Sequence, residues 1–254
     1  MSIYMTGKVA LVTGGSMGIG KATAQAFAAA GAAVVIASRS AGPGEETARE
    51  ICESGGQCTW VQADVTQAKQ VAALVKTTIK TYGRLDYAFN NAGSGGMGGM
   101  VAKMKEEEWD KTINGFLKSV FLCMKYELQA FLEHGIRGAI VNNSSVDGER
   151  AFPNDPGYSA AKHGVLGLTK SAALQYARFG IRINAVCPGW ILTPMVEEYI
   201  EHQRGAMSSI LRHQPIGRVG KPEEVAQAVL WLCSDNASLV LGTALAVDGG
   251  YLAV

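Results

Sequence analysis

The segment YSAAK, residues 158–162, places a phenol and an ammonium group four positions apart. On a helix, residues i and i+4 lie on one face, so we expect Tyr158 and Lys162 to be neighbours. A free tyrosine has a pKa near 10 and exchanges protons poorly at pH 7. A nearby ammonium favours the phenolate and lowers that pKa, so the spacing predicts an acid/base pair. A YxxxK match alone is weak, because most such pairs lie on ordinary helix surfaces.

The composition is that of a globular protein. The chain has 254 residues, of which 48% are apolar and 18% are charged, and its net charge is +1. This balance gives no reason to expect a nucleic-acid partner. No apolar run approaches the roughly 18–20 residues that a membrane span needs, and Met1 does not begin a signal segment. The five scattered cysteines suit reduced thiols, so we expect a cytoplasmic protein. Its four histidines lack metal-ligand spacing, which predicts no metal site; they are His134, His163, His202 and His213.

Apolar runs of strand length alternate with stretches of helical period along the chain. Continuous apolar strands are typical of a parallel sheet covered on both faces. We therefore predict one doubly wound, Rossmann-type α/β domain over residues 1–254, with a parallel sheet of about seven strands and helices on both faces. The predicted strands are residues 8–14, 32–38, 58–65, 85–93, 138–145, 181–189 and 243–250. The predicted helices are residues 19–31, 44–55, with acids in its first turn, 67–82, 106–133, 158–178 and 222–235.

A glycine-rich turn, TGGSMGIG (residues 13–20), separates the first strand from the first helix. Gly14 would allow a tight turn, Gly18 would let the backbone approach a ligand, and Gly20 would let the helix pack closely on the sheet. The helix N-terminus would present free N–H groups to a pyrophosphate. The spacing is GxxxGxG rather than GxGxxG, so the motif alone is also consistent with simple chain reversal.

The end of the second predicted strand indicates which dinucleotide would bind. A carboxylate at this place would bind the ribose 2′-hydroxyl of NAD, but the chain has Ser38, Arg39 and Ser40. A guanidinium suits a 2′-phosphate, because its planar fork donates two parallel hydrogen bonds. We therefore expect NADP(H) to be preferred over NAD(H). The alternative is that Arg39 is an ordinary solvated loop residue.

Several motifs accompany YSAAK in a fixed order: TGGSMGIG, ADV, NNAG, VNNSS, PGWILTP and a terminal VDGG. Together they resemble the classical short-chain dehydrogenase/reductase family over essentially the whole chain. The resemblance implies hydride transfer between NADP(H) and an alcohol or carbonyl carbon, with Tyr158 as the acid/base. It implies that Lys162 lowers the pKa of Tyr158 and holds the nicotinamide ribose, and that Ser145 orients the substrate oxygen.

The same resemblance assigns cofactor contacts. Asp64 and Val65 would border the adenine, Asn91 the ribose, and Ile191 and Thr193 the nicotinamide carboxamide. For Asp64 a strand-end cap, and for Thr193 a helix N-cap, are the alternatives from the residues alone. The full set of expected cofactor contacts is Gly14, Ser16, Gly18, Ile19, Gly20, Ser38, Arg39, Asp64, Val65, Asn91, Tyr158, Lys162, Pro188, Gly189, Ile191 and Thr193.

One position departs from the family pattern. The family usually carries an asparagine before a leucine in the long central helix, where it supports a water that links the lysine to bulk solvent. Here Phe116 occupies that place, and Asn114 lies about 200° around the helix. Gly115 could mark a kink that admits Asn114. Either water enters by another route and activity is retained, or turnover is impaired.

Three segments are expected to wall the substrate site: residues 94–104, 146–157 and 190–215. The last is long enough to form a mobile lid. Its apolar residues, with two nearby methionines, predict a mainly apolar pocket for a ketone or secondary alcohol; they are Met195, Tyr199, Ile200, Met207, Met97 and Met100.

The resemblance also implies a homotetramer that forms through the two long helices and the last strand. Small residues on the second long helix agree with this, although they would equally suit packing within one chain. The competing hypothesis is a non-catalytic NADP(H)-binding sensor or scaffold, which only Phe116 favours.

Overall fold

The sheet has seven parallel strands in the order β3-β2-β1-β4-β5-β6-β7. A computed structural model describes residues 3–95 and 98–254 of the chain. The strand order reverses between β1 and β4, which is the doubly wound arrangement predicted from the sequence. The strands are β1 (Val9–Thr13), β2 (Ala33–Ser38), β3 (Gln57–Gln62), β4 (Tyr87–Asn90), β5 (Ala139–Asn143), β6 (Arg182–Pro188) and β7 (Ala244–Val247).

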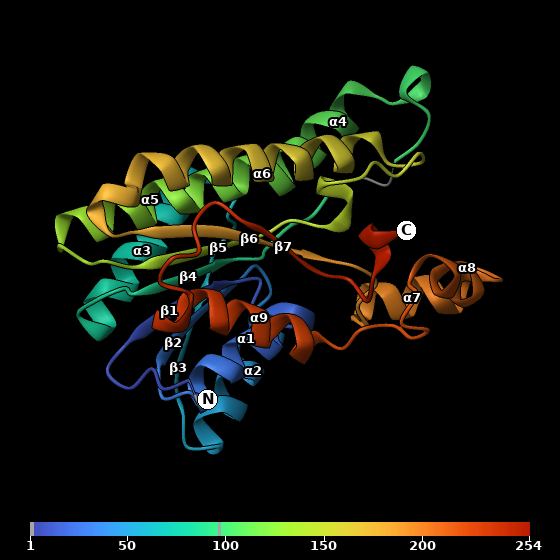
Figure 1. The fold of residues 1–254 in the computed structure, drawn as a ribbon. Coiled ribbons are helices and arrows are strands. Elements are labelled where there is room, and N and C mark those ends of the chain that lie inside the picture. Colours follow the sequence, from blue (N-terminus) through green and yellow to red (C-terminus); the bar gives the residue numbers. More distant parts are fainter. Residues whose placement is uncertain (1–2, 96–97) are drawn as a thin grey trace.

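Helices cover both faces of this sheet, as Figure 1 shows. One face carries α1 (Gly18–Ala29), α2 (Ala41–Glu53) and α9 (Pro222–Cys233). The other carries α3 (Ala68–Tyr82), α4 (Glu106–Ile113), α5 (Ser119–Glu133) and α6 (Pro156–Tyr176). Each layer buries its own apolar cluster against the strands, and this burial is the main force that stabilises the fold.

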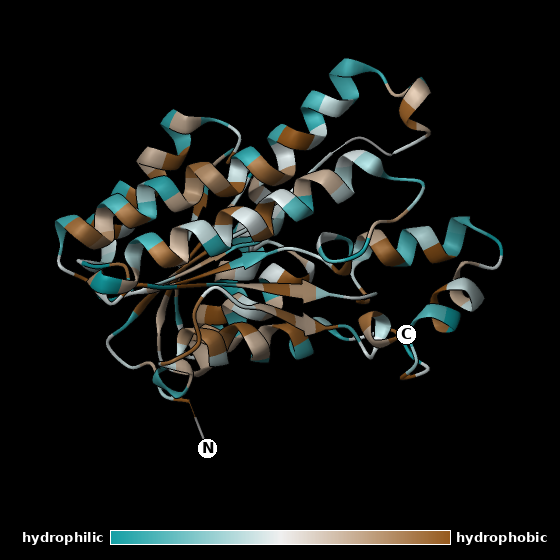
Figure 2. Ribbon diagram, turned by 45° about the horizontal axis from the view of Figure 1, so that its top comes forward, coloured by the Kyte–Doolittle hydropathy of each residue, from teal (hydrophilic) through white to brown (hydrophobic). Residues whose placement is uncertain are grey.

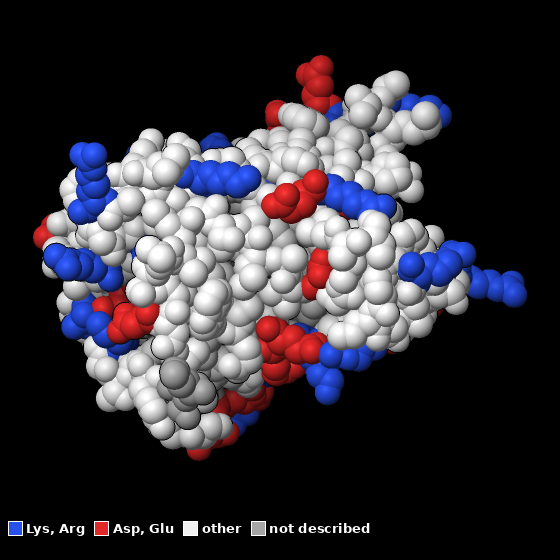
Figure 3. Space-filling view, in the orientation of Figure 1, with Lys and Arg blue, Asp and Glu red and all other residues white. Residues whose placement is uncertain are grey.

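Burial along the strands follows their place in the sheet. Every residue of β1 is buried, whereas the edge strands β3 and β7 are partly exposed. Figure 2 shows hydrophobic strands between helices whose surfaces alternate between hydrophobic and hydrophilic residues. On the face drawn in Figure 3, charges of both signs are interspersed. Within residues 3–95 and 98–254, no helix is long and apolar enough to cross a bilayer.

Two predicted elements differ from the structure. α2 begins at Ala41 rather than at residue 44, so its first turn contains no acidic residue, contrary to the prediction. The helix begins early because Ser40 already has the extended backbone of an N-cap, and Pro43 is tolerated within a first helical turn. The segment 190–215, for which no helix was predicted, contains α7 (Pro194–His202) and α8 (Ala206–His213) beyond the carboxyl end of β6 (Figure 1).

The base of this segment is fixed by a buried side chain, Gln214. Its Oε1 accepts a hydrogen bond from the Trp190 backbone N–H at 2.9 Å. Its Nε2 donates to the carbonyl oxygens of Arg218 at 2.7 Å and Trp190 at 3.2 Å. The Trp190 ring stacks on Tyr199 of α7, with 5.5 Å between ring centroids. These contacts tie the start of the segment to its end.

The predicted long helix 106–133 is interrupted by a π-helical turn, Asn114–Lys118, between α4 and α5. The Ser119 N–H bonds to the Asn114 carbonyl, five residues earlier. Gly115 is required here because a Cβ at this position would lie 1.6 Å from the Ser94 carbonyl oxygen. The predicted irregularity at Gly115 is therefore confirmed. Such π turns shift the phase of the side chains that follow.

A buried network of polar side chains links β4 and β5 to α5 and α6, on the face of the sheet that these helices cover. Asn90 Nδ2 donates to Glu127 Oε2 and to Asn142 Oδ1, both at 3.0 Å. Asn142 Nδ2 donates to Thr169 Oγ1 at 2.9 Å. Glu127 is fully buried, and its Oε1 has no hydrogen-bond partner among the residues that the structure describes. Burial therefore raises the pKa of Glu127 to about 8.

This raised pKa predicts a pH-dependent penalty that Glu127→Gln should remove. The folded chain holds the Glu127 proton up to about pH 8, whereas the unfolded chain releases it near pH 4.5. Stability is therefore lost as pH rises from about 4.5 to 8, and the loss persists above that range. We expect Glu127→Gln to raise the free energy of unfolding by about 2–4 kcal/mol near pH 8.5, and far less near pH 4.5. Urea unfolding at both pH values tests this, with Glu133→Gln on the exposed side of α5 as the matched control. Parallel pH dependence in wild type and Glu127→Gln would contradict it.

Candidate active site

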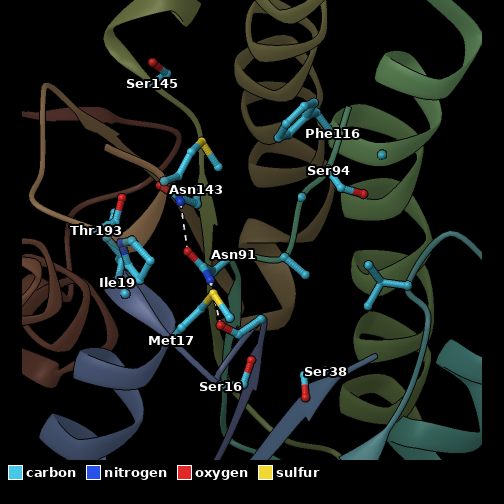
Figure 4. Close-up of a pocket in the computed structure, with 18 of the residues that line it drawn as sticks. Ser16, Met17, Ile19, Ser38, Asn91, Ser94, Phe116, Asn143, Ser145 and Thr193 are labelled. Carbon is cyan, nitrogen blue, oxygen red and sulfur yellow. Dashed lines mark hydrogen bonds between the residues drawn. The ribbon is translucent and has the colours of Figure 1, made fainter. Parts of the chain in front are cut away.

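A cavity of about 390 Å³ lies beyond the carboxyl ends of the strands. It is lined by the β1–α1 turn and by the residues that follow β2, β3, β4, β5 and β6. In the view of Figure 4, Ser16 and Ser38 lie at one end, and Ser145 and Phe116 at the other. Of the predicted catalytic residues and cofactor contacts, all except Gly20 line this one cavity. The cavity is therefore the candidate active site.

The glycine turn shapes one wall of the cavity. Gly14 has a φ of +66°, which confirms the tight turn, and Gly18 has a φ of +52°. A Cβ on Gly20 would lie 2.1 Å from the Gly14 carbonyl oxygen. Gly20 therefore lets α1 pack closely on the turn that precedes it, whereas the prediction had this helix packing closely on the sheet. α1 has no side-chain cap at Met17, so the first N–H groups of α1 are free to bind an anion.

At the end of β2, Ser38 is engaged in hydrogen bonds, whereas the side chain of the next residue, Arg39, is free in the part of the chain that the structure describes. Ser38 Oγ accepts a hydrogen bond from Trp60 Nε1 at 2.9 Å and donates to the Ser40 carbonyl at 3.0 Å. The Arg39 backbone carbonyl accepts from Gln62 Nε2 at 2.9 Å. The Arg39 side chain is exposed, and its guanidinium has no partner among the residues that the structure describes. A free cation therefore stands at this end of the cavity.

Asp64 and Val65 line the cavity after β3, but the Asp64 carboxylate already has partners. Its Oδ1 accepts hydrogen bonds from the Thr66 N–H at 2.9 Å and from the Thr66 hydroxyl at 2.7 Å. The strand-end cap that the sequence allowed is thus present. Val65 is buried beside it.

Asn91 is held by residues that the sequence analysis did not single out. Thr13 Oγ1 accepts from the Asn91 and Ala92 backbone N–H groups, at 3.0 and 3.1 Å. Asn143 Nδ2 donates to Asn91 Oδ1 at 2.9 Å, as Figure 4 shows. The Asn143 Oδ1 atom is buried without a hydrogen-bond partner in residues 3–95 and 98–254, and Asn143 lines the cavity. The sequence signal that could have identified Asn143 is a polar residue within a largely apolar, buried strand.

Ser145, Tyr158 and Lys162 meet at the far end of the cavity. Ser145 follows β5, where its hydroxyl accepts the Asp147 N–H at 3.1 Å. Asp155 caps α6 by accepting the Tyr158 N–H at 3.1 Å, so the helix begins at Pro156 and places Tyr158 in its first turn. Lys162 is one turn further and only 4% exposed. Its ammonium donates to the Asn143 backbone carbonyl at 2.7 Å.

The predicted effect of Lys162 on Tyr158 is not seen in this structure. Burial raises the pKa of Tyr158 well above its ordinary value of 10, and a hydrogen bond with Ser145 opposes the rise only in part. Burial also lowers the pKa of Lys162 to about 8. The physical reason is geometric: the Lys162 ammonium binds the Asn143 carbonyl and lies 5.4 Å from the centroid of the Tyr158 ring. Without a closer charge, desolvation determines both pKa values.

Phe116 reaches the same end of the cavity from the π-helical turn. Its ring meets the Tyr158 ring edge to face, with centroids 4.9 Å apart and an interplanar angle of 88°. The Lys162 ammonium lies over the Phe116 ring, 5.1 Å from its centroid. Gly115 and Phe116 line the cavity, whereas Asn114 does not.

The segment after β6 closes the remaining side. Pro188, Gly189, Ile191 and Thr193 all line the cavity. Thr193 occupies the N-cap position of α7, but its hydroxyl makes no capping hydrogen bond. Of the residues predicted to form the apolar pocket, Met195 lines the cavity, whereas Tyr199, Ile200, Met207 and Met100 do not. Met97 lies outside the described residues.

The donor set fits an anionic dinucleotide. Uncapped N–H groups of α1 lie near Gly18, a free guanidinium stands at one end, and an ammonium and a phenol stand at the other. A Cβ on Gly18 would lie 3.1 Å from Thr193 Cγ2, so a side chain there would fill the gap between α1 and the segment after β6. The gap and the donors together suit a phosphate-bearing ligand that lies across the carboxyl ends of the strands.

Comparison with known proteins gives the family. A family model described as enoyl-(acyl carrier protein) reductase matches residues 4–252. The chain belongs to the short-chain dehydrogenase/reductase family.

Three similar proteins illustrate the relationship. Cyclohexanol dehydrogenase of an Acinetobacter species is 43% identical, over 99% of this chain and 97% of its own length. Cis-4-hydroxycyclohexanecarboxylate dehydrogenase of Sinomonas cyclohexanicum is 44% identical, over 97% of each chain. A crystal structure of a variant actinorhodin polyketide ketoreductase with NADPH has a TM-score of 0.90 at 38% identity, and covers 96% of this chain and 97% of its own.

The lowered pKa of Lys162 predicts that Lys162→Met stabilises the fold at neutral pH. Below about pH 8 the folded chain keeps a buried ammonium, whereas the unfolded chain holds its proton up to about 10.5. The penalty is present at pH 7 and disappears as pH rises from about 8 to 10.5. We expect Lys162→Met to raise the free energy of unfolding by about 1–3 kcal/mol at pH 7, with a smaller gain near pH 10. Urea unfolding checks this against Lys170→Met, which changes an exposed lysine of the same helix. Destabilisation at pH 7 relative to that control would show that the buried ammonium is net favourable.

Proposed function

We propose that the chain is an NADP(H)-dependent oxidoreductase that interconverts apolar secondary alcohols and ketones. The observation that carries this proposal is the convergence of Ser145, Tyr158 and Lys162 at one end of a cavity whose other end holds the free Arg39 cation. Family membership and the names of the relatives agree with it. A nicotinamide cofactor supplies or accepts the hydride when it is bound.

The chain's own residues handle the proton and the oxygen. Tyr158 donates its proton to the carbonyl oxygen in reduction and accepts the hydroxyl proton in oxidation. Ser145, which is close enough to hydrogen-bond the Tyr158 hydroxyl, orients the same substrate oxygen. Lys162 holds a positive charge beside the phenol and binds the nicotinamide ribose.

Several features support NADP(H) as the preferred cofactor. Arg39 carries an unpaired guanidinium at the end of β2, in the described part of the chain, and no carboxylate follows that strand directly. A guanidinium pairs with a phosphate dianion through two parallel hydrogen bonds. The actinorhodin ketoreductase structure, similar over almost all of this chain, contains NADPH.

The substrate class is narrowed by the relatives and by the site. Two relatives above 40% identity are named for six-membered ring alcohols. The lining of the cavity includes the Phe116 ring and Met195, which suit an apolar ring. We infer an alicyclic secondary alcohol or the corresponding ketone, covered by residues 190–215 acting as a lid.

We also propose a cytoplasmic homotetramer. Large apolar side chains are exposed on the outer faces of α5 and α6, among them Leu174 at 78%, with Phe121 and Leu132. Exposed apolar side chains on both long helices support association through these helices. The five cysteines are free, which suits a reducing compartment.

If Arg39 binds the 2′-phosphate, Arg39→Asp should reverse the cofactor preference. The new carboxylate repels the phosphate and accepts hydrogen bonds from a ribose diol. We expect kcat/KM for NADPH to fall by roughly tenfold or more, and kcat/KM for NADH to rise. Steady-state kinetics with both cofactors measures the ratio, and Arg178→Asp, at an exposed position, controls for net charge. An unchanged ratio in Arg39→Asp would refute this assignment.

Tyr158→Phe should abolish turnover while leaving the fold intact. Loss of a general acid/base lowers kcat by about 10²–10⁴-fold, in both directions. The assay follows the absorbance of reduced nicotinamide with cyclohexanols, cyclohexanones, open-chain ketones, diketones and quinones. Tyr176→Phe, at the other end of α6, is the matched control. A wild-type chain that binds NADPH tightly but turns over none of these compounds would support the sensor hypothesis.

A further inference from the structure

Phe116 sits in a recess that is shaped for its ring. A Cβ on Gly93 would lie 2.5 Å from Phe116 Cδ1, and a Cβ on Gly95 would lie 2.6 Å from Cε2. Both glycines therefore let the chain after β4 pass directly against the ring. On the helix side, Gly115 also allows this close approach, because the Ser94 carbonyl lies where a Cβ of residue 115 would be. The ring is thus confined between this backbone segment and α6.

The open side of the recess faces the two proposed catalytic residues. The Lys162 ammonium lies over the ring of Phe116, 5.1 Å from its centroid, and over the ring of Tyr158, 5.4 Å from its centroid. Cations within about 6 Å of an aromatic centroid are attracted by the negative ring face, most strongly where water is excluded. The two rings are nearly perpendicular, at 88°, which is a preferred geometry for an aromatic pair.

Within the described part of the chain the ammonium donates one hydrogen bond, to the Asn143 carbonyl, although it carries three donors. No carboxylate within the described residues forms an ion pair with it. Its burial would therefore be poorly compensated by polar contacts alone. The two ring faces supply the missing stabilisation.

We propose that Phe116 is a positioning residue of the active site, whose ring face binds the Lys162 ammonium and whose edge-to-face contact fixes the Tyr158 ring. This inference rests on the proposed function, in which Tyr158 and Lys162 carry the proton chemistry. An aromatic wall then replaces a polar side chain on this side of the lysine. Phe116 keeps Lys162 protonated at neutral pH without a counter-ion.

Other titratable groups also affect the pKa values of Tyr158 and Lys162, so a test must leave these groups unchanged. Asp147 and Cys187 raise the pKa of Lys162, while Asp147, Asp155 and Cys187 raise the pKa of Tyr158. They come from the turn after β5, the loop before α6, and β6. None is altered by a change at position 116.

The test replaces Phe116 with phenylalanines that carry one, two, three and five ring fluorines. Fluorination drains the negative ring face and changes the ring's size only slightly, so the wall remains while the cation–π attraction fades. We expect the pKa of the Lys162 ammonium to fall stepwise, by about half a unit to one unit across the series. NMR titration of lysine labelled at Cε, assigned with Lys162→Met, reads this pKa without requiring turnover. The alkaline limb of the kcat profile should move to lower pH by the same amount.

Controls separate this proposal from the proposed function. The same fluorinated series at Phe179, an exposed residue beyond α6, should leave the Lys162 pKa unchanged. Phe116→Leu keeps an apolar side chain without a ring face, and should lower the Lys162 pKa as the full series does. A Lys162 pKa that does not move with fluorination or in Phe116→Leu would overturn the proposal. An active Tyr158→Phe chain would overturn the catalytic assignment and leave the NMR result standing.

Discussion

The site depends on holding one ammonium group, that of Lys162, almost entirely out of water. Its stabilising contacts are the Asn143 carbonyl and the faces of the Phe116 and Tyr158 rings. These groups come from β5, the turn between α4 and α5, and α6. A buried charge with so few polar partners requires accurate placement of each. The packing of helices on this face of the sheet is therefore constrained by a single cation.

Hydrogen bonds on both faces of the sheet fix the strand residues that surround this ammonium. On the cavity side, Thr13 of β1 holds the Asn91 backbone, and Asn91 binds the side chain of Asn143. On the opposite side, Asn90 donates to Asn142 and to the buried Glu127. Side chains alternate along a strand, so consecutive asparagines in β5 serve the two faces in turn. The carbonyl that receives Lys162 lies where these two networks meet.

Sequence reasoning predicted the sheet, the Gly14 turn and the Tyr158–Lys162 pair, because each depends on local periodicity or spacing. It did not find Asn143 or the helices within 190–215, and it gave the wrong sign for the pKa of Tyr158 in this state. These features depend on contacts between distant segments. Spacing places Lys162 one turn from Tyr158, but only the fold decides that its ammonium binds the Asn143 carbonyl. Desolvation, which dominates both pKa values, has no signature in the order of residues.

Burial shifts the two pKa values of the pair in opposite directions, and each shift favours the uncharged form of its group. With its pKa raised, the Tyr158 phenol stays protonated at neutral pH and is ready to act as an acid toward a carbonyl oxygen. Its action as a base requires a further positive charge or donor near the hydroxyl. The Lys162 ammonium, 5.4 Å from the centroid of the Tyr158 ring, donates its hydrogen bond to a backbone carbonyl. In the protein alone the raised pKa therefore keeps the phenol protonated, and any phenolate would depend on charges that a bound ligand brings to the site.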